Sequence, residues 1–235
     1  MKNLFPTLFA LAVAFATASA QAQAPAAPAA APAASAAAAA GDPKSVEARA
    51  AMCMGCHSIK GYQASFPEVH KVPMIAGQSE KYIVSALTAY KNGDRKHPTM
   101  RAIAGSLSDQ DMKDLAGYYS KLAGETKLPD QPSRQPDAQV AQLLQKAACT
   151  SCHGTNFSKP IDVYPKIAGQ HADYLFVALK AYKQDNNPAV GRNNAVMGAI
   201  AKQFSHAELK ALAQYVGSLD GELKTVPESR FHHQQ

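Results

Sequence analysis

Two short runs of the chain place a histidine directly after a pair of cysteines: Cys53-Met54-Gly55-Cys56-His57 and Cys149-Thr150-Ser151-Cys152-His153. This Cys-x-x-Cys-His pattern is typical of covalent c-type haem attachment. Residues three and four apart share one face of a helix. Both cysteines can therefore form thioethers at one haem edge while the histidine presents a ring nitrogen to the iron. The sequence predicts two c-type haems bound through Cys53, Cys56, Cys149 and Cys152, with His57 and His153 as axial iron ligands.

Other uses of the four cysteines fit the pattern less well. Zinc sites made of two Cys-x-x-Cys pairs usually have the pairs about 15–20 residues apart, whereas 93 positions separate Cys56 from Cys149. A thioredoxin-like pair would need a strand–helix unit around it, and none is evident. Two structural disulfides stay open in an oxidising compartment, although they do not explain the histidine after each pair.

The sequences around the two motifs repeat each other, which predicts two similar domains in tandem. In each half a helix leads into the motif, a Pro-x-Ile-Ala-Gly-Gln loop follows, and an amphipathic middle helix and a capped final helix complete the order. The loops are 73–78 and 165–170, the middle helices 80–91 and 174–183, and the final helices 108–122 and 205–219. No segment has the period-two pattern of a strand. The expected fold is all-α, with two domains related by internal duplication.

The remaining segments define the expected domain boundaries. Residues 1–20 carry Lys2, a short apolar run and Ala18-Ser19-Ala20, which together predict a cleaved signal peptide. Residues 21–43 form an Ala/Pro-rich tract expected to be a flexible tether. The N-terminal domain then spans 44–126, a Pro-rich linker 127–136 and the C-terminal domain 137–221, and a polar tail of 222–235 is expected to be frayed. Export through a signal peptide places the mature protein in the periplasm.

The internal repeat also selects the residues that could bind iron opposite the histidines. Met100 is the only methionine of the first domain with a methionine counterpart, Met197, and both are expected in loops before the final helices. His/Met ligation at both irons is therefore the favoured prediction. A thioether ligand raises the reduction potential, and a six-coordinate iron leaves no position for substrate, which favours electron transfer over catalysis. The histidines that lack a histidine counterpart are expected at the surface or beside a site, with His97 the main rival to Met100; they are His70, His97, His171 and His206.

Pro73 and Pro165 precede the middle helices of the two halves. Each proline stiffens its loop. A haem-ligating histidine generally donates its second ring N–H to a carbonyl or carboxylate. The backbone carbonyls at these prolines are candidates for that acceptor.

The charge balance is mildly basic, with 24 Lys and Arg against 18 Asp and Glu. Because the excess is spread without a run of like charges, nucleic-acid binding is not expected. The basic excess is compatible with docking of an acidic protein partner or with peripheral association with anionic lipid. An ordinary solvated surface is the simpler explanation of this excess.

With these features assembled, residues 44–220 resemble the dihaem cytochrome c4 family. The resemblance is carried by the two haem motifs, the paired Pro-x-Ile-Ala-Gly-Gln loops, the methionine before each Ser-capped helix, and a tyrosine late in that helix (Tyr118 and Tyr215). It implies two class I cytochrome c folds about a pseudo-twofold axis, with haem attachment outside the cytoplasm. It also implies a shuttle that carries electrons from a quinol-oxidising complex, a quinol-cytochrome c reductase, to a terminal oxidase.

Two alternatives share the haem motifs. Related two-haem chains serve as cytochrome subunits of periplasmic dehydrogenases, and sequence does not separate that role from a shuttle. A dihaem peroxidase or a thiosulfate-oxidising enzyme would need a haem with an open, histidine or cysteine sixth position. All four cysteines already lie in the haem motifs, so an enzyme is the weaker hypothesis.

Replacing Met100 by alanine tests the proposed iron ligand. We expect Met100→Ala to leave the first haem high-spin or histidine-ligated at a lower potential, because the thioether that favours Fe(II) is lost. Optical spectra and redox titration measure this change. An unchanged spectrum would place the ligand elsewhere.

Overall fold

The helices of the first half follow the order expected from the sequence. The computed structural model describes residues 43–227, and in this range the first half contains α1 (Pro43–His57), α2 (Glu80–Asn92), α3 (Pro98–Gly105) and α4 (Asp109–Leu122). Ser79 caps α2 by accepting a hydrogen bond from Tyr82 N–H, and Gly93 ends the helix in the left-handed conformation. α2 thus ends one residue beyond the predicted middle helix of 80–91.

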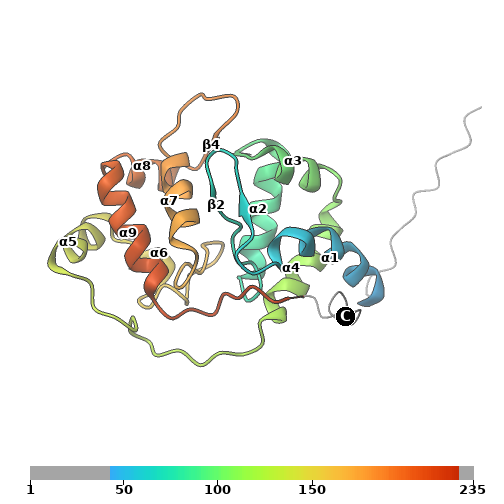
Figure 1. Ribbon diagram of the computed structural model, residues 1–235, viewed down its shortest axis with the longest axis horizontal. Helices are drawn as coiled ribbons and strands as arrows, with labels where there is room; N and C mark the ends of the chain where they lie inside the picture. The colour runs from blue at the N-terminus through green and yellow to red at the C-terminus, as the bar shows by residue number, and fades with distance from the viewer. Residues whose placement is uncertain (1–42, 228–235) are drawn as a thin grey trace, which may run out of the picture. The chain divides into compact units, whose positions relative to one another are not determined.

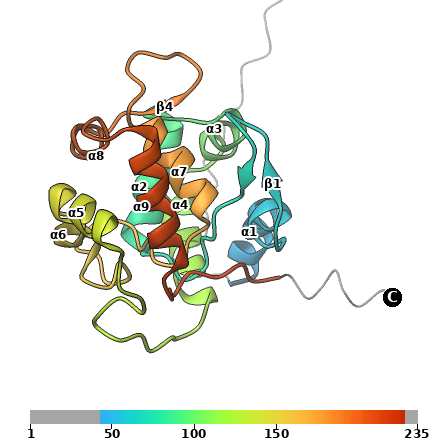
Figure 2. The ribbon, with the colours of Figure 1, turned by 60° about the vertical axis from the view of Figure 1, so that its left-hand side comes forward.

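The second half repeats this order from residue 138 onwards. Its helices are α5 (Ala138–Ala147), α6 (Thr150–His153), α7 (Ala172–Ala181), α8 (Ala195–Ala201) and α9 (His206–Ser218). The second haem motif differs from the first in its local backbone, because Ala148 adopts a positive φ of 48° and separates α5 from α6. The first motif lies within the continuous helix α1. Figures 1 and 2 both show α7 and α9 side by side, and these helices contact each other.

Strands are short in the described part of the chain. Strands β1 (Gln63–Ala64) and β2 (His70–Lys71) pair with each other in the first half. β3 (Arg95–Lys96) and β4 (Gly191–Arg192) pair across the two halves, with Arg95 opposite Arg192. The all-α, two-domain prediction is confirmed. The domain boundaries themselves stay a prediction.

The prediction that Met100 and Met197 lie in loops is wrong. Each is the third residue of a short helix, α3 or α8, rather than part of a loop. His97 and Asn194 begin these helices as side-chain caps, and Pro98 occupies the first turn of α3. Helices of eight and seven residues are too short for an apolar period to reveal them.

The expected frayed tail also differs from the structure in the part that is described. Leu223 is 6% exposed, and Lys224 forms an antiparallel bridge with Ala76 of the first half. Residues 222–224 are therefore packed. The predicted signal peptide and almost all of the Ala/Pro-rich tract lie outside the described residues. Within residues 43–227, no helix combines the length and apolar character needed to cross a membrane.

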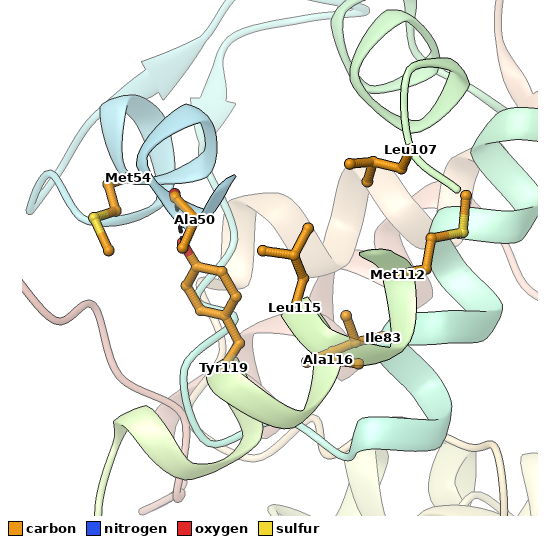
Figure 3. Packing of buried hydrophobic residues seen from close by; sticks show 8 residues of the cluster. All are labelled: Ala50, Met54, Ile83, Leu107, Met112, Leu115, Ala116 and Tyr119. Carbon is orange, nitrogen blue, oxygen red and sulfur yellow. Dashed lines mark hydrogen bonds between the residues drawn. The ribbon is translucent and has the colours of Figure 1, made fainter. Parts of the chain in front are cut away.

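Each half is organised around its final helix. Both final helices begin with a full capping box, Ser108 with Asp111 and Ser205 with Glu208, as predicted. Figure 3 shows the core of the first half, where the Tyr119 hydroxyl donates to the carbonyl of Ala50 at 3.3 Å and so joins α4 to α1. The buried members of this cluster are Ala50, Met54, Ile83, Leu107, Met112, Leu115, Ala116 and Tyr119.

Truncating Leu115 tests the importance of this core. Leu115 is 2% exposed, so Leu115→Ala removes buried apolar contacts and leaves a cavity, and we expect the free energy of unfolding to fall by about 2–5 kcal/mol. Denaturant titration of the holoprotein measures this loss. Ile161 is 56% exposed, so Ile161→Ala should change stability by no more than about 0.5 kcal/mol. Equal losses in the two variants would contradict the assignment of this core.

Candidate functional site

The two motif histidines occupy equivalent environments. His57 Nδ1 lies 2.8 Å from the carbonyl oxygen of Pro73, and His153 Nδ1 lies 2.9 Å from that of Pro165. A carbonyl can only accept, so Nδ1 must carry the proton, and the lone pair of each neutral ring is then on Nε2. Burial lowers the pKa of both histidines, and the carbonyl bond opposes this only in part. Both rings are thereby held neutral with Nε2 ready to bind a metal.

The four cysteines of the two motifs form no disulfide bonds. As unmodified thiols, Cys53 has its pKa raised by burial and Cys149 has its pKa raised by burial to about 11. Among residues 43–227, no group of three or more His, Cys, Asp or Glu side chains is placed to hold a metal ion. The zinc and disulfide alternatives therefore find no support in the described residues.

The loop after each motif is fixed to the final helix of the same half. Gly77 N–H donates to Tyr119 O at 2.9 Å, and Gly169 N–H donates to Val216 O at 3.1 Å. Both glycines have positive φ, 83° and 71°, which glycine tolerates best. A Cβ at Gly77 would lie 2.6 Å from the carbonyl oxygen of Glu222. The glycine in each loop therefore permits both the turn and the close approach of a second backbone.

Met100 and Met197 are both half-buried on their short helices. The backbone N–H of Met100 donates to the Nδ1 of His97, and that of Met197 donates to the Oδ1 of Asn194. His97 and Asn194 are thus counterparts as helix caps. Iron binding through His97 Nε2 would need the ring proton on Nδ1, which would break the cap. The ligand roles of the two methionines stay a prediction.

The other histidines make different contacts. His70 is buried, with Nδ1 2.8 Å from Glu68 O. His171 precedes α7 without a side-chain capping bond, and His206 packs edge-on against Phe176.

A buried cationic cluster that was not predicted from the sequence lies where the halves meet. Arg95, which is 8% exposed, donates to the hydroxyls of Tyr82 and Tyr174, both at 3.2 Å. Arg192 also donates to Tyr174, at 3.1 Å. Each guanidinium additionally lies over a tyrosine of its own half, 4.5 Å from the ring centroid of Tyr90 for Arg95 and 5.4 Å from that of Tyr182 for Arg192.

This cluster carries positive charge without an acidic partner. Within residues 43–227, the ion pairs involve neither Arg95 nor Arg192, and Arg95 Nε is buried without a hydrogen-bond acceptor. Burial by itself would raise the pKa of Tyr174, but the two guanidiniums outweigh it and lower that pKa to about 8. Each arginine precedes its methionine by five residues, a shared spacing that could have revealed the pair.

The residues present fit a c-type haem in both halves. Free thiols are available for thioether bonds, a neutral histidine has its Nε2 free, and a methionine occupies the same helical position in each half. Arg95 and Arg192, which have no carboxylate partner among residues 43–227, could pair with the propionate carboxylates of a bound haem. The fold and these paired sites define a tandem protein of the c-type haem class.

The comparisons with known proteins agree with this class. Residues 45–123 and 138–220 each match the family model described as Cytochrome c. The chain is 30% identical over 192 residues to cytochrome c4 of Thiocapsa roseopersicina, covering 76% of this chain and 93% of the relative. It is 29% identical over 194 residues to cytochrome c4 of Stutzerimonas stutzeri, covering 77% and 90%. The chain therefore belongs to the cytochrome c family, as a two-domain member of the cytochrome c4 group.

Solved structures extend the match. Reduced cytochrome c4 from Pseudomonas stutzeri is 25% identical with a TM-score of 0.54, covering 77% of this chain and 100% of that one. Acidithiobacillus ferrooxidans cytochrome c4 is 28% identical with a TM-score of 0.53, covering 72% and 99%. The protein is a dihaem electron-transfer cytochrome rather than an enzyme, with two covalently attached c-type haems.

Replacing His97 tests whether its side chain caps α3 or binds the iron. We expect His97→Asn to keep the parent spectrum, because asparagine already caps the equivalent helix α8 through Asn194. His97→Ala should also keep the spectrum but lower the free energy of unfolding by about 1 kcal/mol, the usual cost of a lost cap. Optical spectroscopy and denaturant titration measure the two effects. A changed spectrum in the asparagine variant would identify His97 as an iron ligand.

Proposed function

We propose that this protein is a periplasmic shuttle that carries electrons from a quinol-oxidising complex to a terminal oxidase through two His/Met-ligated haems. The observation that carries this proposal is the identical placement of Met100 and Met197, each the third residue of a side-chain-capped helix. Both sites would then offer a histidine on one side of the iron and a thioether on the other.

The side chains have separable tasks in this function. Bound haem supplies reversible one-electron exchange at its iron. Cys53, Cys56, Cys149 and Cys152 would anchor it, and His57 and His153, fixed by the carbonyls of Pro73 and Pro165, would each hold one axial position. A methionine thioether favours Fe(II) and so raises the reduction potential. With both axial positions filled by the chain, little changes in coordination between oxidation states, which suits rapid transfer.

The periplasmic location rests on two supports. The N-terminal sequence has the features of a signal peptide, and the resemblance to cytochrome c4 implies haem attachment outside the cytoplasm. The mild excess of basic residues is compatible with docking to acidic redox partners or with peripheral association with the membrane surface.

A second function is favoured by particular relatives. The chain is 28% identical over 179 residues to a thiosulfate dehydrogenase electron acceptor of Thiomonas intermedia, covering 72% of this chain and 79% of the relative. A thiosulfate dehydrogenase structure from Marichromatium purpuratum also matches, at 27% identity and a TM-score of 0.53, although only 36% of that chain is covered. These similarities support a role as the electron-accepting cytochrome of a periplasmic dehydrogenase. An active site of its own, as in a peroxidase, would need an open haem.

Counting the methionine-to-iron charge-transfer bands tests the ligation. We expect the near-infrared spectrum of the oxidised, haem-quantified protein to contain two equivalents of this band per chain, because each half supplies one methionine. One equivalent or none would indicate an open or histidine-ligated haem, and peroxide and sulfur substrates would then be examined.

Stopped-flow mixing with purified partners distinguishes the two electron-transfer roles. A respiratory shuttle should be reduced by a quinol-cytochrome c reductase and re-oxidised by a terminal oxidase. A dehydrogenase partner should instead be reduced fastest by a thiosulfate dehydrogenase with thiosulfate. Failure of every acceptor to re-oxidise the reduced protein would contradict both roles.

A further inference from the structure

Two buried glutamines cross between the halves of the molecule. Gln78 and Gln170 end the two Pro-x-Ile-Ala-Gly-Gln loops, and each is 4% exposed. The side chain of Gln170 accepts from Met74 N–H at 3.0 Å and donates to Met74 O at 2.9 Å. The side chain of Gln78 makes the same pair of bonds with the backbone of Lys166, both at 2.9 Å. Each glutamine thus binds the loop of the opposite half.

The residues bound in this way follow the two prolines whose carbonyls hold the motif histidines. The peptide group between Pro73 and Met74 accepts from His57 through its oxygen and donates to Gln170 through its nitrogen. The peptide group between Pro165 and Lys166 connects His153 to Gln78 in the same manner. One amide unit therefore separates each histidine from the glutamine of the other half.

An amide group transmits polarisation between its two ends. Donation of the N–H to an acceptor increases the negative charge on the carbonyl oxygen, and hydrogen bonds joined in this way strengthen each other by roughly 10–30% per bond. A more negative carbonyl holds the histidine Nδ1–H more strongly, which makes the ring a better electron donor to a metal. Stronger donation stabilises Fe(III) and lowers the reduction potential.

From this geometry we infer that Gln170 and Gln78 are crossed positioning residues, each setting the donor strength of the haem-ligating histidine in the opposite half. Gln170 acts on His57 through the Pro73–Met74 amide, and Gln78 acts on His153 through the Pro165–Lys166 amide. The inference rests on the proposed iron ligation by these histidines. The inference is distinguished by which haem responds. A glutamine that acted only through its proximity to a haem would affect the haem of its own half, whereas these glutamines are expected to affect the haem of the opposite half.

Redox titration of leucine variants, followed by NMR, tests the crossing. The haem signals of the oxidised holoprotein are assigned to each half by nuclear Overhauser contacts, and each set is followed through the titration. We expect Gln170→Leu to raise mainly the midpoint potential of the N-terminal haem and Gln78→Leu mainly that of the C-terminal haem. Each variant should also move the Nδ1–H signal of the opposite histidine upfield in the reduced protein, because that hydrogen bond is weakened.

A matched control separates this effect from a loosened contact between the halves. Asn193 donates to Asp94 of the first half at 3.0 Å through a neutral side chain that is not connected to either histidine. Asn193→Ala should leave both potentials and both Nδ1–H signals unchanged. If a leucine variant does not fold, Gln170→Met or Gln78→Met is used in its place, because methionine keeps the unbranched length of the glutamine side chain.

Four outcomes would overturn the inference. Shifts in the haem of the mutated half would show local action, and equal shifts in both haems, or shifts in the Asn193→Ala control, would show a general structural effect. Absence of haem-shifted Nδ1–H signals from His57 and His153 in the parent protein would overturn the proposed ligation together with the crossing. That last result is read before any variant is made, so the two failures are distinguishable.

Discussion

Both sites depend on one hydrogen bond, from the ring of a motif histidine to the carbonyl of a proline 16 or 12 residues later. Because the carbonyl can only accept, the bond fixes the tautomer and directs the lone pair of the ring to Nε2. The proline loop must in turn be held still. Gly77 and Gly169 attach it to the final helix of the same half, and the crossed glutamines attach it to the other half.

The contact between the halves contains buried polar and charged side chains, among them Gln78, Gln170 and Arg95. It contains the two glutamines with their amide partners and the Arg95–Arg192 pair with its tyrosines. Buried polar groups are costly unless they are paired. The oxygen and the nitrogen of each glutamine side chain are both hydrogen-bonded, whereas Arg95 and Arg192 have no carboxylate partner within residues 43–227. The hydrogen bonds of this contact therefore include those that fix the two proline loops beside the motif histidines.

The duplication makes departures from symmetry informative. His97 caps the first short helix, and Asn194 caps the second. His97, which the sequence offers as the rival of Met100 for the iron, therefore has a capping role that asparagine fills in the other half. Similarly, Ala148 breaks the helix before the second motif, whereas α1 runs through the first. The two sites are thus built from the same parts with different local backbone constraints.

The sequence by itself determined the two haem motifs, the duplication, the capped final helices and the candidate methionines, because these are short-range patterns repeated at a nearly constant offset. It did not reveal the short helices of Met100 and Met197, since a cap and a proline start them within too few residues to show a period. The partners of Gln78, Gln170, Arg95 and Arg192 were decided by the tertiary structure alone. The bonds from Gln170 to Met74, from Gln78 to Lys166 and from Arg95 to Tyr174 join residues 79 to 96 positions apart, and only folding brings such groups into contact.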